Sequence, residues 1–246
     1  MANIVLLHGF CERKAMWEST VESLGDTHRY LVLDLPGFGA NNASCKSITD
    51  MAKYVFDEMR VAGMTNAILV GHSMGGYVAL ELAKLRPSVV DGIALVHSHA
   101  AADDANKKQN RTKLVDFLSR NTAHDFLKPF AKDLVAAPNQ SNKQLINQVW
   151  DLVKDTQKEG IIQAAIAMRN RTDNNMLLSQ FEGPILWVVG QYDQFMSQDE
   201  ILGQVALSRH AMLDLIPNAG HMSMFETPER FNASLARFVA YVEGLA

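Results

Sequence analysis

The chain has 246 residues, of which 48% are hydrophobic and 20% charged, and its formal net charge is −4. These values are typical of a soluble globular domain, and they exclude an intrinsically disordered chain, which carries fewer apolar residues and more net charge. The acidic balance gives no electrostatic reason to bind nucleic acid or an anionic membrane, so we expect neither as a partner.

The N-terminal apolar run, Ile4–Leu7, is too short for a secretory signal or a membrane span and suits a buried strand. No other apolar run approaches the roughly 20 residues that a membrane span needs. The two cysteines, Cys11 and Cys45, show neither CxxC spacing nor a disulfide framework. We therefore expect a cytoplasmic protein with reduced thiols.

Short apolar runs that end in turn residues recur along the chain and are typical of strands buried on both faces of a parallel sheet. They are Ile4–Leu7, Tyr30–Leu33, Ala67–Val70, Ile93–Val96, Ile185–Val189 and Met212–Ile216. Segments with helical periodicity lie between them, at Ser47–Gly63, Met74–Leu85, Leu202–Leu207 and Pro228–Val242. This alternation predicts an α/β fold with a doubly wound, mostly parallel sheet.

The alternation stops between about residues 98 and 181, where no strand pattern occurs. Amphipathic helices are predicted there at Asp104–Ser119, His124–Val135, Asn142–Glu159 and Ile161–Asn170. Because ligands bind outside the carboxyl ends of parallel strands, helices inserted between two strands are well placed to form a lid. We therefore expect a core of residues 1–98 and 181–246 and a helical cap of residues 99–180.

The strongest local pattern is G-x-S-x-G at residues 71–75, where an apolar strand passes into a helix. A serine nucleophile must project from a tight strand-to-helix turn, in which side chains at the flanking positions would collide with neighbouring backbone. The pattern therefore predicts Ser73 as a nucleophile. The backbone amide of Met74, at the start of the helix, is a predicted donor to a developing oxyanion.

Other loops that follow predicted strands carry the remaining parts of such a site. Phe10 follows His8-Gly9 directly after the first strand, and its amide is the expected second oxyanion donor. Asp193 comes just after a late strand, and His221 lies in a loop beyond the last one. The chain order serine, aspartate, histidine is that of a hydrolase triad, so Ser73, Asp193 and His221 are the predicted catalytic residues.

These motifs resemble the α/β-hydrolase superfamily over essentially the whole chain. The turn Asp34–Gly39 is similar to the D-x-P-G-x-G turn of that family, and His221 with Glu226 looks like its histidine loop. Within the superfamily the chain most resembles small lidded carboxylesterases and enol-lactone hydrolases, which the segment Ala167–Arg171 supports. Serine at position 73, in place of aspartate, excludes epoxide hydrolases and haloalkane dehalogenases of this fold.

The combination predicts a serine hydrolase that cleaves a small-molecule carboxylic ester through a Ser-His-Asp acyl-enzyme mechanism. It needs no metal or other cofactor, and the remaining histidines lack metal-ligand spacing. A lactonase, a carbon–carbon hydrolase or hydroxynitrile lyase with the same triad, and a receptor that retains the triad are the alternatives. The expected substrate pocket comprises Ser98, His99, Trp150, Phe195, Met196 and Met222. Arg169 and Arg171 are open to two interpretations, a carboxylate-binding site or a solvated helix end, of which we favour the second.

Overall fold

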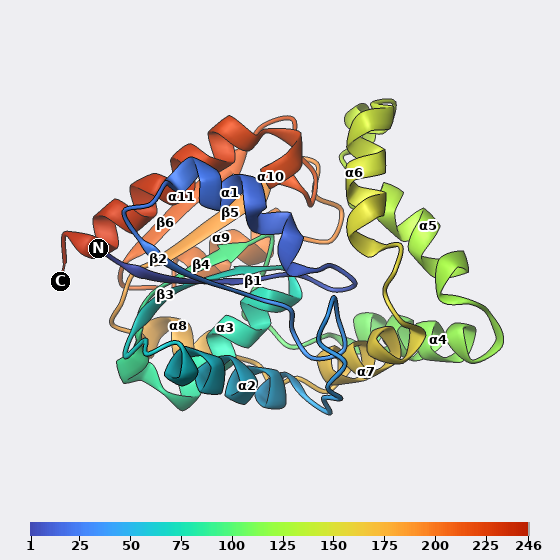
Figure 1. Ribbon diagram of the computed structural model, residues 1–246, viewed down its shortest axis with the longest axis horizontal. Coiled ribbons are helices and arrows are strands. Elements are labelled where there is room, and N and C mark those ends of the chain that lie inside the picture. Colours follow the sequence, from blue (N-terminus) through green and yellow to red (C-terminus); the bar gives the residue numbers. More distant parts are fainter. Residues whose placement is uncertain (246) are drawn as a thin grey trace.

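The apolar runs of the chain form one six-stranded sheet in the computed structural model, which describes residues 1–245 (Figure 1). The strands are β1 Asn3–Leu7, β2 Arg29–Leu33, β3 Ala67–His72, β4 Val90–Val96, β5 Ile185–Gly190 and β6 Ala211–Ile216. Their order is β2-β1-β3-β4-β5-β6, and each neighbouring pair is parallel. The predicted doubly wound α/β fold is therefore confirmed.

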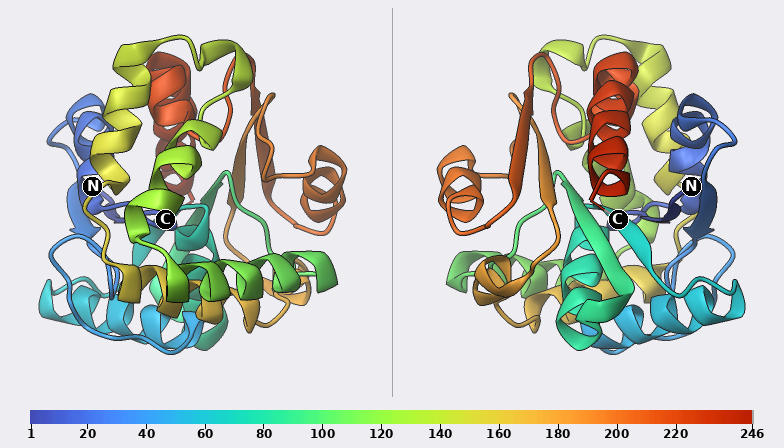
Figure 2. Two further views of the ribbon diagram at one scale, coloured as in Figure 1. Left: turned by 90° about the vertical axis from the view of Figure 1, so that its right-hand side faces the viewer. Right: turned by 90° about the vertical axis from the view of Figure 1, so that its left-hand side faces the viewer.

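Helices cover both faces of this sheet, which is why its central strands consist of unbroken apolar runs (Figure 2). Helices α1 (Glu18–Leu24) and α11 (Pro228–Glu243) cover one face, and α2 (Ile48–Val61) and α3 (Met74–Leu85) cover the other. Strands β3 and β5 are buried at every residue, whereas the edge strand β6 has exposed positions.

Capping residues explain where several helices begin. The Ser47 hydroxyl accepts a hydrogen bond from the Asp50 N–H (3.0 Å), so α2 starts at the next residue, as expected. Helix α9 (Gln198–Val205) begins four residues earlier than predicted, because Ser197 caps it by accepting a hydrogen bond from the Glu200 N–H. The short helices α1 and α10 (Ser223–Glu226) were not predicted.

Five helices occupy the segment between β4 and β5. They are α4 Ala105–Arg120, α5 Ala123–Asp133, α6 Lys143–Val153, α7 Lys158–Arg169 and α8 Asn175–Gln180. The prediction of one helix over Asn142–Glu159 is wrong. The chain turns after Val153, and the Thr156 hydroxyl donates a hydrogen bond to the Cys11 carbonyl (2.7 Å), so a contact with the N-terminal loop replaces a helical turn.

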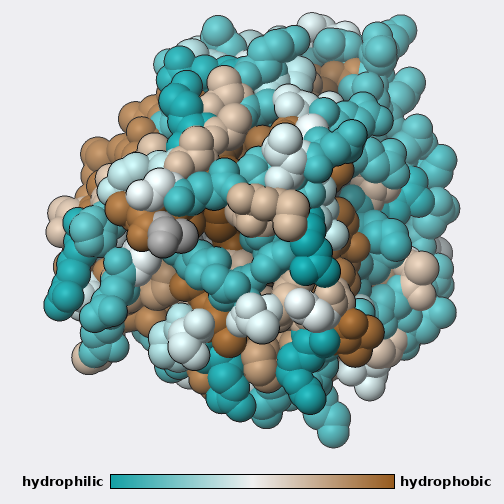
Figure 3. Space-filling model, turned by 60° about the vertical axis from the view of Figure 1, so that its left-hand side comes forward, coloured by the Kyte–Doolittle hydropathy of each residue, from teal (hydrophilic) through white to brown (hydrophobic). Residues whose placement is uncertain are grey.

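Helices α4 to α7 lie beyond the carboxyl ends of the strands, in front of the sheet in the left view of Figure 2. Both termini lie at the opposite end of the molecule (Figure 1). Figure 3 brings that side forward, where polar side chains cover most of the face and apolar ones form small patches between them. Within residues 1–245, no helix combines the length and hydropathy that a membrane-spanning segment requires.

Candidate active site

The turn between β3 and α3 holds Ser73 in a strained backbone conformation, with a φ of 48°. Its N–H donates to the Val96 carbonyl (2.8 Å), which fixes the turn to the neighbouring strand. A Cβ atom at Gly71 would collide with the backbone of Gly75, and one at Gly75 would collide with the Leu7 carbonyl. Both glycines are therefore needed for the close packing that projects Ser73 from the carboxyl edge of the sheet.

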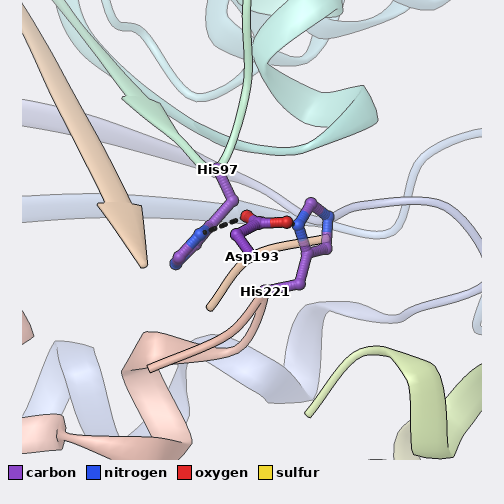
Figure 4. Close-up of side chains that lie close together, drawn as sticks. All are labelled: His97, Asp193 and His221. Atoms are coloured by element: carbon purple, nitrogen blue, oxygen red, sulfur yellow. Dashed lines mark hydrogen bonds and ion pairs between the residues drawn. The ribbon is translucent and has the colours of Figure 1, made fainter. Parts of the chain in front are cut away.

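Asp193 and His221 meet at the same edge (Figure 4). His221 Nδ1 donates a hydrogen bond to Asp193 Oδ2 (2.8 Å), and the Phe195 N–H donates to Oδ1 (2.9 Å). Burial alone would raise the pKa of Asp193, but the imidazoles of His221 and His97 hold it well below its usual range. Asp193 is thus a buried carboxylate that orients the His221 ring.

His97, at the end of β4, is a second imidazole on this carboxylate and was not predicted. Its Nδ1 donates to the same Asp193 oxygen (2.8 Å), and the Ser223 hydroxyl donates to its Nε2 (2.7 Å). Burial lowers the pKa of His97 to about 4, so the ring is neutral at neutral pH. His97, Asp193 and His221 each offer one possible metal-ligand atom, and these three atoms lie within 4.8 Å of one another. A metal ion bound there would have to displace both hydrogen bonds to Asp193.

A second buried acid–imidazole pair lies on the other side of His221. Glu12 Oε2 accepts hydrogen bonds from His72 Nδ1 (2.8 Å) and the Gly9 N–H (2.6 Å), and His72 Nε2 donates to the His221 carbonyl (2.8 Å). Burial alone would lower the pKa of His72, but the Glu12 carboxylate raises it, and the imidazolium lowers the pKa of Glu12. This hydrogen-bonded pair joins the loop after β1, the Ser73 turn and the His221 loop.

Glu12 had no recognisable pattern in the sequence, because its partner His72 is 60 residues away in the chain. Glu226 is easier to recognise, since it belongs to the histidine-loop pattern. Its Oε1 accepts the Gly220 N–H (2.8 Å), and its Oε2 accepts the Ala136 N–H (2.9 Å). Glu226 therefore holds the His221 loop and ties it to the segment that follows α5.

A cavity of about 310 Å³ adjoins both Ser73 and His221. Its apolar and aromatic lining comes from the loops at the sheet edge, α3 and the inserted helices. These residues are Phe10, Tyr77, Leu114, Phe126, Phe130, Leu134, Met168, Phe195 and Met196. Its polar lining comprises Glu12, His99, Asp103, Lys107, Asn110 and Arg111.

Half of the six predicted pocket residues line this cavity, namely His99, Phe195 and Met196. The other predicted pocket residues lie elsewhere. The Ser98 hydroxyl donates to the Ser73 carbonyl (2.7 Å) and so supports the turn. Trp150 packs edge-on against His124, with ring centroids 5.1 Å apart, and Met222 is fully buried. None of these three is among the lining residues of the cavity.

The interpretation of Arg171 as part of a solvated helix end is wrong, because α7 ends at Arg169 and Arg171 is buried. Its Nη1 donates to Asp103 (2.6 Å), and its guanidinium carbon lies 3.9 Å from the centroid of the Tyr77 ring. Arg169 instead donates from Nη1 to the Thr112 hydroxyl on α4 (3.1 Å).

The backbone amides of Phe10 and Met74 are free to bind a ligand, since within residues 1–245 neither donates to a protein acceptor. Ser73 and His221 line the same cavity. Within residues 1–245, their side chains form no hydrogen bond with each other. Such bonds often tighten only when substrate is bound. The cavity brings together the Ser73 hydroxyl and an imidazole that Asp193 orients, and Phe10 is among its lining residues, whereas Met74 is not. A hydroxyl and an oriented imidazole are the nucleophile and the base that acyl transfer requires.

Comparison with known proteins gives one family match over most of the chain. The model of the alpha/beta hydrolase fold family matches residues 2–228. The chain is 28% identical over 244 residues to the dihydrolipoyllysine-residue acetyltransferase component of the acetoin cleaving system of Cupriavidus necator. That alignment covers 95% of this chain, which spans only 62% of the length of that relative.

Two further relatives match over nearly their whole length. The pimeloyl-[acyl-carrier protein] methyl ester esterase of Xanthomonas oryzae pv. oryzae is 28% identical, with 97% of this chain and 95% of that protein covered. Among solved structures, a thermophilic esterase from Thermogutta terrifontis superposes with a TM-score of 0.93 at 27% identity, covering 98% of this chain and 90% of the other.

Proposed function

This chain belongs to the alpha/beta hydrolase fold family, and we propose that it is a serine hydrolase that cleaves a small carboxylic ester. The observation that carries the proposal is the Asp193–His221 hydrogen bond (2.8 Å) beside a cavity that Ser73 also lines. The relatives from Xanthomonas and Thermogutta are both named esterases, which supports an ester as the bond that is cleaved.

In the acylation step, His221 Nε2 takes the proton of the Ser73 hydroxyl while Oγ attacks the ester carbonyl. Asp193 holds the imidazole with its proton on Nδ1 and stabilises the imidazolium that forms. The free amides of Phe10 and Met74 bind the tetrahedral oxyanion, and each donor of this kind contributes on the order of 3 kcal/mol. His221 then gives its proton to the leaving alcohol.

Deacylation repeats these steps with water in place of Ser73. His221 removes a proton from the water, which attacks the acyl-enzyme, and Ser73 recovers its proton as the carboxylic acid leaves. His97 keeps the Asp193 carboxylate fixed through a second hydrogen bond (2.8 Å). The Glu12–His72 pair holds the backbone that carries the Phe10 amide in place against the Ser73 turn.

We also propose that residues 99–180 act as the cap of this site. Phe126, Phe130 and Leu134, on or just after α5, form one apolar wall of the cavity, and Met168 of α7 adds to it. Phe130 lies against Phe10, with ring centroids 5.9 Å apart, so the cap packs directly on the predicted oxyanion loop. A cap in this position shields the acyl group and excludes bulk water during the reaction.

The test is hydrolysis of a p-nitrophenyl ester series, from acetate to decanoate, by the wild-type protein and by Ser73→Ala. We expect Ser73→Ala to lower kcat by about 10⁴-fold or more, because no other group in the cavity replaces the nucleophile. Ser119→Ala is the matched control, since the exposed Ser119 hydroxyl donates to the Asp116 carbonyl on α4, on the surface of the molecule. Wild-type rates in Ser73→Ala would refute the proposal.

Product analysis separates the alternatives that share this triad. Trapping of an acyl group on Ser73, detected by mass spectrometry of the quenched enzyme, would support the esterase and related lactonase mechanisms. A hydroxynitrile lyase would release aldehyde and cyanide without that adduct. A folded protein that binds esters but turns none over would instead fit a receptor.

A further inference from the structure

The cavity has a cationic end that the proposed ester hydrolysis does not use. We propose that the substrate carries a carboxylate in addition to its ester, and that Arg111, with Lys107 beside it, binds this carboxylate. The inference rests on the proposed function and narrows its substrate class to monoesters of dicarboxylic acids. Hydrolysis would then add water across the ester C–O bond and release a dicarboxylate and an alcohol.

Arg111 lies on α4 and lines the same cavity as Ser73. Its guanidinium carbon is 5.7 Å from the centroid of the Phe10 ring, so it stands above the loop that carries a predicted oxyanion donor. Within residues 1–245 its only hydrogen bond runs from Nε to Asp103 Oδ2, at a long 3.4 Å. Both Nη groups therefore remain available, and a planar guanidinium presents them in the geometry that a carboxylate accepts.

Asp103 does not neutralise this end of the cavity, because it already has a closer partner. Its Oδ1 accepts a hydrogen bond from the buried Arg171 (2.6 Å). Lys107 pairs with Glu200 at a longer 3.7 Å, and both side chains are partly exposed. The other carboxylate that lines the cavity besides Asp103 is that of Glu12, which is bound to His72. At this end of the cavity three cations thus face two carboxylates, which leaves one positive charge for a substrate anion to balance.

His99, which also lines the cavity, supports this view of the local charge. Its pKa is lowered to about 3, first by burial and then by Lys107, Arg171 and Arg111. The Tyr77 hydroxyl lies 3.3 Å from Nε2, and Glu200 Oε1 approaches Nδ1 to 3.4 Å. The buried Nδ1 has no hydrogen-bond partner among residues 1–245. A positive field and an unpartnered buried nitrogen at one end of the cavity both favour an anionic ligand.

The apolar lining of the cavity limits what can connect the ester and the carboxylate of the ligand. Leu114, Met168 and Met196 line the cavity together with its aromatic side chains, and they suit methylene groups rather than polar ones. A chain with an ester at one end, methylenes in the middle and a carboxylate at the other end offers a matching group to each of these surfaces. A neutral ester would leave Arg111 desolvated by the ligand without a partner.

The experiment compares kcat/KM for monomethyl adipate and for methyl hexanoate, which differ by the distal carboxylate. We expect the wild-type protein to prefer monomethyl adipate by at least about 10-fold, and Arg111→Gln to reduce this ratio by about 10- to 100-fold, mainly through KM. Arg111→Lys should retain part of the preference, because lysine keeps the positive charge but cannot form the bidentate hydrogen bonds of a guanidinium. Arg120→Gln, at the exposed end of the same helix, is the matched control and should keep the wild-type ratio.

A wild-type ratio near one, a ratio that Arg111→Gln leaves unchanged, or an equal loss in Arg120→Gln would each overturn the inference. Calorimetry with Ser73→Ala measures the affinity for each ester without turnover. Ser73→Ala should bind monomethyl adipate more tightly than methyl hexanoate, and Ser73→Ala/Arg111→Gln should lose this preference. Failure of the proposed function would appear instead as ester hydrolysis that survives Ser73→Ala. The two failures are therefore distinguishable.

Discussion

The edge of the sheet and the inserted helices form two walls of one cavity, but they are built in different ways. At the sheet edge, Glu12, His72 and Asp193 are buried and bound to neighbouring loops by several hydrogen bonds. On the inserted side, α4 buries only Leu118, and its cavity residues Lys107 and Arg111 remain partly exposed.

This contrast separates reaction chemistry from substrate choice. Groups locked by short hydrogen bonds at strand ends cannot move without breaking the sheet edge, which suits atoms that must meet a reacting carbonyl with high precision. Side chains on a shallowly packed helix can adjust to ligands of different length, because such regions open at low free-energy cost. Substitutions at the sheet edge should therefore change kcat, whereas those on the inserted helices should change KM and chain-length preference.

After Ser73→Ala, the largest expected effect of a side-chain change at the sheet edge is that of Asp193→Asn. An asparagine amide carries no negative charge to stabilise an imidazolium, and its NH₂ group donates where the second carboxylate oxygen accepts, so His221 would lose its tautomer and kcat should fall by about 10⁴-fold. Steady-state kinetics with an active ester measure the loss, and Asp199→Asn on the exposed start of α9 is the control. A loss below about 10-fold would place the functional acid elsewhere.

Glu12→Gln tests whether the second buried pair also belongs to the catalytic wall. Glutamine still accepts the Gly9 N–H but removes the negative charge that raises the pKa of His72, so kcat should fall by about 10- to 100-fold as the oxyanion loop shifts. Glu12→Asp should restore part of the rate, and the exposed Glu18→Gln should change nothing. If Glu12→Gln changed only thermal stability and left kcat intact, the pair would be structural alone.

His99→Gln tests the place where the two walls meet. His99 follows β4 at the sheet edge, and its pKa is lowered first by burial and then by cations that include Lys107 and Arg111 on α4. The folded-state pKa of about 3 lies below the unfolded value of 6.5, so between these values only the unfolded chain takes up a proton. The free energy of unfolding should fall as the pH drops through this window, by about 2 kcal/mol between pH 7 and pH 5 for this group. Urea unfolding should show that His99→Gln loses less stability than wild type over that range. The exposed His210→Gln is the control, and equal pH slopes in wild type and His99→Gln would contradict the assignment.

The smallest effect is expected on the inserted side. Phe130 of α5 lies between Phe10 and Phe195, with ring centroids 5.9 and 6.3 Å away, and Phe130→Ala would lengthen the cavity. We expect the optimum in the p-nitrophenyl series to move to longer acyl chains, with kcat/KM for short chains lower by about 10-fold or less. Phe117→Ala, 40% exposed on α4, is the matched control. An unchanged optimum would show that α5 does not shape the acyl site.

Local patterns in the sequence predict the strands of the sheet and the approximate positions of the predicted catalytic loops. Apolar runs such as Ile4–Leu7 and Ile185–Val189 predict strands because burial on both faces demands uninterrupted hydrophobic residues. The glycines around Ser73 mark a turn for steric reasons that hold wherever the motif occurs. Parallel strands bring their carboxyl ends to one edge, so the sequence predicts that Asp193 and His221 lie at the same sheet edge as Ser73.

Only the tertiary structure reveals the contacts between side chains that are distant in the chain. Three contacts join residues dozens of positions apart with no shared local pattern, namely Glu12–His72, His97–Asp193 and Asp103–Arg171. The ends of the inserted helices and the exclusion of Trp150 from the cavity depend on how α4 to α7 dock, which helical periodicity does not encode. Local sterics and hydrophobic patterning act between near neighbours, whereas electrostatic partners and cavity shape arise only when distant segments pack together.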